Sequence, residues 1–140
     1  MNILFVDDEE DFRETLLKRM KKRKVNASGV SSGEEALEFL KQNENETDVV
    51  VLDVRMKGGM DGIRALKEIK TLHPRLEVIM LTGHASLEVA KEGMEIGAFD
   101  YLMKPVDVDD LLYKLQDAYK KKKIQEEKIK KIGEVIEAGK

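Results

Sequence analysis

The chain lacks cysteine and long apolar runs, and each absence excludes a class of protein. It has 140 residues, no cysteine and only two prolines. Without cysteine there can be no disulfide framework and no thiolate metal site, which fits a reducing compartment. No apolar stretch approaches the roughly 20 residues that a membrane-spanning helix needs, and the chain begins without the positive segment of a signal peptide. We therefore expect a cytoplasmic protein with no membrane association.

Excess positive charge is also missing. The net charge is −3, and it is unevenly distributed, with an acidic body up to residue 119 and a basic segment over residues 120–140. Proteins that bind nucleic acid gain much of their affinity by neutralising phosphates, and the basic segment contains no aromatic residue to stack on bases. We expect no direct nucleic-acid binding. The length predicts one domain with a full hydrophobic core.

Four short apolar runs are the most informative feature that is present, because each stops at polar residues. Runs of this length, separated by helix-length segments, predict buried parallel strands, and a weaker strand is expected at residues 25–30. The carboxyl ends of parallel strands meet on one edge of a sheet, so the polar residues should lie together. The runs are residues 3–6 before Asp7 and Asp8, 49–52 before Asp53, 78–81 before Thr82, and 99–103 before Lys104.

The segments between these strands carry apolar residues at the spacing of amphipathic helices. The second helix is expected to be capped by Ser31 or Ser32, and the third to stop at His73-Pro74, because proline restricts the residue before it. Five strands alternating with five helices predict a doubly wound α/β sheet with helices on both faces. The expected helices cover residues 9–22, 33–42, 63–72, 86–96 and 108 onward.

The three aspartates at the strand ends predict a metal site. Ionised carboxylates about 4 Å apart repel by about 4 kcal/mol per pair at an effective dielectric near 20, so either one takes up a proton or a cation lies among them. Oxygen ligands without His or Cys favour Mg²⁺, or Mn²⁺, over Zn²⁺. Magnesium on carboxylates keeps positions for phosphate oxygens, and Thr82 and Lys104 add a hydroxyl and a positive charge. These are parts for phosphoryl transfer, with Asp53 as the candidate nucleophile.

Five segments together resemble the receiver domain of two-component response regulators. The resemblance covers residues 1–123, and Lys104 follows Thr82 by 22 positions, as in the family. It implies a flavodoxin-like, five-stranded parallel sheet in the order 2-1-3-4-5. The segments are Val6-Asp7-Asp8-Glu9, Leu52-Asp53-Val54-Arg55-Met56, Met60-Asp61-Gly62, Leu81-Thr82-Gly83-His84-Ala85, and residues 97–105 with Lys104-Pro105.

By this resemblance, Asp53 is the phosphoacceptor of a phosphorelay and receives its phosphoryl group from a sensor histidine kinase or a phosphotransfer protein. Asp7 and Asp8 hold Mg²⁺ together with Asp53 and the backbone carbonyl of Arg55. The resemblance also implies that the protein catalyses only its own phosphorylation and dephosphorylation, and is not an enzyme with an external substrate.

The resemblance assigns the remaining positions to binding and switching. Thr82 and Lys104 bind phosphoryl oxygens, as does the backbone at Arg55 and Gly83. The ring of Tyr101 follows the movement of Thr82 and so helps to change the surface. The peptide bond between Lys104 and the proline after it is expected to be cis.

One loop departs from the family pattern. Lys57-Gly58-Gly59 stands where the family usually has a proline after Met56, with an apparent one-residue insertion before Gly62. We expect metal ligation to survive and the loop to be more mobile. Arg55 and His84 flank the acceptor, where side chains can screen or position the hydrolytic water, and this leaves the phosphoryl lifetime open.

The altered loop motivates an alternative function, a receiver-like module that docks partners without being phosphorylated. An aspartyl-phosphate phosphatase of another α/β family is disfavoured, because such an enzyme requires a second acid two residues after the nucleophile, and Arg55 occupies that position.

Residues 124–140 are expected to form a helical extension or a linker. Apolar residues continue at roughly helical spacing past the domain, and Glu126 and Glu127 each precede a lysine by four positions, which supports a helix. The extension is either a solvated linker or a helix that forms a homodimer. Residues 120–123, which are all lysine, interrupt the apolar stripe and weigh against the dimer.

Overall fold

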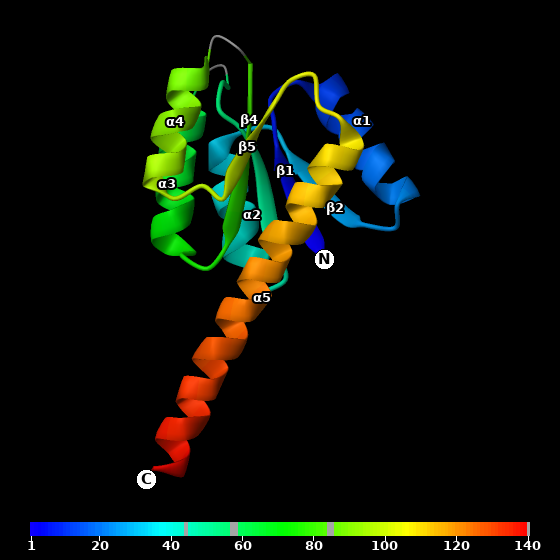
Figure 1. Ribbon diagram of the computed structural model, residues 1–140. Helices are drawn as coiled ribbons and strands as arrows, with labels where there is room; N and C mark the ends of the chain where they lie inside the picture. Colours follow the sequence, from blue (N-terminus) through cyan, green and yellow to red (C-terminus); the bar gives the residue numbers. More distant parts are fainter. Residues whose placement is uncertain (44, 57–58, 84–85, 140) are drawn as a thin grey trace.

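The computed structural model describes residues 1–43, 45–56, 59–83 and 86–139, which form one α/β unit (Figure 1). Within these residues five parallel strands lie in the order β2-β1-β3-β4-β5, which confirms the predicted fold class and strand order. The strands are β1 (Asn2–Val6), β2 (Asn26–Val30), β3 (Val49–Asp53), β4 (Glu77–Thr82) and β5 (Asp100–Met103). The helices are α1 (Glu10–Lys22), α2 (Gly33–Asn43), α3 (Gly62–Leu72), α4 (Leu87–Ile96) and α5 (Val108–Ala138).

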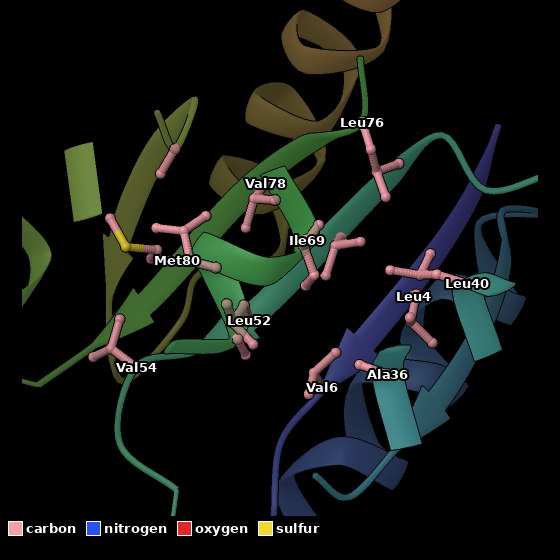
Figure 2. Packing of buried hydrophobic residues seen from close by; sticks show 14 of the residues in the cluster. Leu4, Val6, Ala36, Leu40, Leu52, Val54, Ile69, Leu76, Val78 and Met80 are labelled. Carbon is pink, nitrogen blue, oxygen red and sulfur yellow. The ribbon is translucent and has the colours of Figure 1, made fainter. Parts of the chain in front are cut away.

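Each face of the sheet packs against its own set of helices. Side chains of α2, α3 and α4 cover one face, where Leu4, Leu52 and Met80 belong to one buried cluster with Ile69 of α3 (Figure 2). Side chains of α1 and α5 cover the other face around Phe5. Because both faces are covered, every position of β3 and β4 is buried, which explains why these strands appear in the sequence as continuous apolar runs.

Most predicted boundaries agree with the structure to within one or two residues. Strand β4 extends one residue beyond its apolar run, because the backbone N–H of Lys104 donates to the carbonyl of Thr82 at 2.8 Å and continues the ladder. Helix α2 is capped as predicted, since Ser32 Oγ accepts from the backbone N–H of Glu35 at 3.1 Å. The peptide bond between Lys104 and Pro105 is cis, as expected.

Helix α5 is 31 residues long and continues without a break past the end of the sheet (Figure 1). Where it leaves the sheet, Lys122 is buried and its Nζ lies 3.3 Å from Asp48 and 2.6 Å from Glu126. The neighbouring Lys121 lies 3.4 Å from the buried carboxylate of Glu77. Two of the lysines that interrupt the apolar stripe therefore form ion pairs that hold α5 against the amino-terminal ends of β3 and β4.

The described part of the chain contains no helix with the length and apolar character that crossing a membrane requires.

Candidate functional site: the carboxyl edge of the sheet

Three aspartates meet at the carboxyl ends of two adjacent strands. Val6 pairs with Leu52 in the ladder between β1 and β3, so the residues that follow them, Asp7 and Asp53, emerge side by side. Asp7, Asp8 and Asp53 each offer a carboxylate oxygen, and these oxygens lie within 4.8 Å of one another. Asp7 and Asp53 are buried and Asp8 is half-buried. The structure thus brings together the three acids that the sequence singled out.

Lys104 reaches this cluster from the end of β5. Its Nζ lies 3.0 Å from Asp7 Oδ2, 3.6 Å from Asp53 Oδ2 and 3.2 Å from Glu9 Oε1, above the ring of Phe12. Burial lowers the pKa of the Lys104 ammonium, but its hydrogen bond to Asp7 and the charge of Asp53 outweigh burial and raise that pKa above its usual value. Lys104 is therefore a fixed positive charge beside the acceptor. The pair with Glu9 was missed from the sequence, where Glu9 stood out only by following two aspartates.

The carboxyl group of Asp53 experiences both burial and like charge. Burial, followed by the negative charge of Asp7, raises the pKa of Asp53 from 3.8 to about 6, against the opposing effects of Lys104 and the backbone N–H of Arg55. That N–H donates to Asp53 Oδ1 at 3.2 Å. Three acids and one lysine leave the site with excess negative charge, which a cation can neutralise. The side-chain atoms that could bind such a cation are all carboxylate oxygens. The residues present therefore fit a hard divalent cation such as Mg²⁺ or Mn²⁺.

The two predicted switch residues lie at different depths. Thr82 is 1% exposed at the end of β4, and its hydroxyl donates to the carbonyl of Gly83 at 3.1 Å. A methyl group added at Gly83 would meet nothing within 4 Å, so the backbone there is open to approach. Tyr101, on β5, is 39% exposed. Thr82 directly follows Leu81, the partner of Asp53 in the ladder between β3 and β4, whereas Tyr101 is partly exposed at the surface.

Arg55 makes a contact that the sequence did not predict. Its Nε donates to Ser86 Oγ at 2.8 Å, joining the segment after β3 to the start of α4. Ser86 was predicted only as a helix start, because a serine before a helix ordinarily caps it and nothing local indicates a distant donor. Of the other residues that flank the acceptor, Lys57, Gly58 and His84 lie outside the described residues, so the predictions that involve them stay open.

The strand order and the acids at the carboxyl edge define a class, the doubly wound α/β proteins that bind ligands where the strand order reverses. Within that class the chain belongs to the response regulator receiver domain family, whose sequence model matches residues 3–116. It is a receiver domain of the kind found in two-component systems, as the resemblance predicted.

Similar proteins agree with this assignment. The chain is 41% identical over 118 residues to the transcriptional regulatory protein ZraR of Escherichia coli, which covers 84% of this chain and 26% of ZraR. It is 33% identical over 138 residues to a putative NtrX-like response regulator of Rickettsia bellii, covering 98% of this chain and 28% of that protein. A receiver domain from Clostridium thermocellum superimposes with a TM-score of 0.85 at 35% identity, covering 89% of this chain and 98% of that one. The chain thus spans little more than a quarter of these curated relatives.

Proposed function

We propose that the chain is a phosphorylatable switch in which Asp53 accepts a phosphoryl group from a phosphohistidine of a sensor kinase or phosphotransfer protein. The observation that carries the proposal is the placement of a buried Asp53 within 4.8 Å of Asp7 and Asp8 and 3.6 Å from Lys104 Nζ. The cluster provides a nucleophile, a place for a divalent cation and a fixed positive charge in one small volume. These are the requirements of phosphoryl transfer, which depends mainly on positioning and charge neutralisation.

In the proposed reaction, a carboxylate oxygen of Asp53 forms a bond to phosphorus while the bond from phosphorus to the donor's imidazole nitrogen breaks. The electron pair of that bond stays on the nitrogen. A pKa of about 6 leaves Asp53 largely ionised at neutral pH, as a nucleophile requires. Asp7, Asp8, Asp53 and the backbone carbonyl of Arg55 would hold Mg²⁺, which supplies charge neutralisation at the phosphoryl oxygens.

Lys104 and Thr82 then respond to the new negative charge. The Lys104 ammonium is already 3.6 Å from Asp53 and can turn from Asp7 to a phosphoryl oxygen. The Thr82 hydroxyl can exchange the carbonyl of Gly83 for another phosphoryl oxygen, because a charged acceptor binds more strongly than a neutral one. The movement of Thr82 leaves space for the ring of Tyr101 to turn inward, which shifts an existing two-state equilibrium of the surface. Water attack at phosphorus would later restore the free carboxylate.

A small-molecule phosphoryl donor tests the proposal. Incubation with acetyl phosphate and Mg²⁺ is expected to raise the intact mass by about 80 Da, one metaphosphate unit. Peptide mapping should place the added mass on Asp53, and chelation of Mg²⁺ should prevent it. No adduct, or one at another residue or independent of Mg²⁺, would contradict the proposal. Absence of both an adduct and Mg²⁺ binding would favour the docking module instead.

We also propose that the exposed end of α5 pairs with a second copy of the chain. Ile129, Ile132 and Ile136 are 49%, 60% and 57% exposed, and their spacing of three and four residues is that of a coiled-coil interface. The same stripe, followed backwards, includes Leu115 and Ala118, which pack α5 on the sheet. A second copy offers a helix with the same stripe, so a symmetric pair would bury these side chains.

Analytical ultracentrifugation of the natural chain and of Ile132→Ser tests the proposed dimer. The natural chain is expected to dimerise, and the variant to have a dissociation constant raised at least about 100-fold, because each copy loses about 1.5 to 3 kcal/mol of apolar burial. Lys131→Ser, which replaces the adjacent residue outside the stripe, is the matched control and should dimerise normally. A natural chain that stays monomeric, or equal weakening in both variants, would exclude this interface.

A further inference from the structure

Ser86 occupies the capping position of α4 without capping it. It immediately precedes Leu87, the first residue of the helix, and serine is among the best residues at this position. Yet its hydroxyl accepts no hydrogen bond from the first turn, and its backbone has φ −117° and ψ 13°, outside the extended conformation that a capping residue normally adopts. The hydroxyl instead accepts from Arg55 Nε at 2.8 Å, in a position where Ser86 is 3% exposed.

Arg55 connects this serine to the phosphoacceptor. It lies two residues after Asp53, and its backbone N–H donates to Asp53 Oδ1 at 3.2 Å. Its side chain lines a surface hollow of about 620 Å³ between α3 and α4, together with Val54, Ile63 and Val89. Arg55 therefore borders an open hollow, and its backbone is fixed next to the acceptor. A modest rotation of the side chain can change which group the guanidinium contacts.

A phosphoryl group on Asp53 would change the choice of partner for that guanidinium. A neutral hydroxyl is a weak acceptor, whereas a phosphoryl group carries about two negative charges and can accept two parallel hydrogen bonds from arginine. When Arg55 turns to the phosphoryl oxygens, the Ser86 hydroxyl loses its donor. The donors that a capping hydroxyl at this position would bind are the backbone N–H groups of Glu88 and Val89, in the first turn of α4.

We propose that Arg55 and Ser86 form a two-position latch that couples Asp53 to the start of α4. In the free chain, Arg55 holds the Ser86 hydroxyl away from the helix. In the phosphorylated chain, Arg55 binds the phosphoryl group, and Ser86 turns to the extended conformation and caps α4. The second position rests on the proposed phosphorylation of Asp53, whereas the first does not. This coupling is separate from that through Thr82, and Arg55 and Ser86 act in it as positioning residues.

Amide exchange of Glu88 and Val89, measured by NMR, tests the latch without any phosphoryl donor. In Arg55→Gln the serine is released, so exchange of these amides should slow about fivefold, the effect of one capping hydrogen bond. The double variant Arg55→Gln with Ser86→Ala should show no slowing, and Arg55→Gln with Ser86→Thr should retain it, because threonine keeps the hydroxyl. Unchanged exchange in Arg55→Gln, or slowing that persists with Ser86→Ala, would overturn the latch.

The same amides report on the second position after treatment with acetyl phosphate and Mg²⁺. The natural chain should show about fivefold slower exchange once the mass has risen by about 80 Da. Ser86→Ala should gain the same mass without the slowing. Slowing in phosphorylated Ser86→Ala would overturn the coupling. Absence of the adduct would instead count against the proposed function, and the comparison with Arg55→Gln would still decide the latch.

Discussion

Asp53→Asn is expected to abolish phosphoryl uptake and, without Mg²⁺, to be more stable than the natural chain at pH 7 by about 2 kcal/mol. Asparagine has a similar shape to a protonated aspartic acid but cannot form the acyl phosphate. It also removes a charge that burial and Asp7 disfavour, which is why the pKa of Asp53 rises from 3.8 to about 6. One substitution should therefore remove the activity and stabilise the fold.

The sign of the pH dependence follows from the raised pKa of Asp53. Between pH 3.8 and about 6 the folded chain keeps a proton that the unfolded chain has released. The free energy of unfolding therefore falls as pH rises through this range, and the deficit is constant above it. The stability of Asp53→Asn should lack this fall. Mg²⁺ should stabilise the natural chain more than the variant, since the metal binds the folded state through Asp53.

Urea unfolding at pH 4 and pH 7, without metal, measures the difference. Asp117→Asn is the matched control, because it makes the same chemical change at an exposed position of α5 and should leave the pH dependence of the natural chain intact. If Asp53→Asn were no more stable than the control at pH 7, the prediction would be wrong, because the ionised Asp53 would not lower the free energy of unfolding. An adduct of about 80 Da on Asp53→Asn would exclude Asp53 as the acceptor.

Gly62→Ala is expected to lower the free energy of unfolding by about 3 kcal/mol. A methyl group at Gly62 would lie 2.5 Å from the carbonyl oxygen of Asp53 and 2.5 Å from the Cα of Val54. Both atoms belong to the backbone of the buried end of β3 and its continuation, so neither can rotate away as a side chain can. Relief requires α3 to move away from the strand that carries Asp53, which should also weaken Mg²⁺ binding.

Gly133→Ala is the matched control for this substitution. Gly133 lies within the exposed part of α5, and a methyl group there would meet nothing within 4 Å. Alanine is a better helix former than glycine, so this variant should be unchanged or more stable by up to about 1 kcal/mol. Thermal unfolding and Mg²⁺ titration of both variants check the prediction. Similar free energies of unfolding for the two variants would contradict the prediction, because they would show that α3 can shift to accommodate the methyl group without destabilising the fold.

The fold could be predicted from patterns that are visible in the linear sequence. Continuous apolar runs such as residues 49–52 indicate strands that are covered on both faces, and amphipathic segments between them indicate the covering helices. The strand order followed from the family resemblance rather than from the runs themselves. Asp7 and Asp53 could be expected to meet, because parallel strands deliver their carboxyl ends to the same edge.

Other features depended on contacts that sequence spacing does not record. Gly62 stood out in the sequence only as the last residue of the segment Met60-Asp61-Gly62, and its close approach to β3 became visible only when α3 was placed against the sheet. Lys122 was regarded as an interruption of an apolar stripe, yet it is buried and paired with Asp48, 74 residues away. Ser86 was recognised as a helix start, although its partner is Arg55, 31 residues away.

The sequence by itself determined the class of fold, the family and the set of acids at the carboxyl edge, because hydrophobic periodicity and motif order are local properties of the chain. Only the tertiary structure decided how Lys104 divides its contacts between Asp7, Glu9 and Asp53, why Gly62 has no room for a side chain, and which group holds Ser86. Each of these features is a contact between different elements of the fold, and such contacts are set by the packing of helices on the sheet.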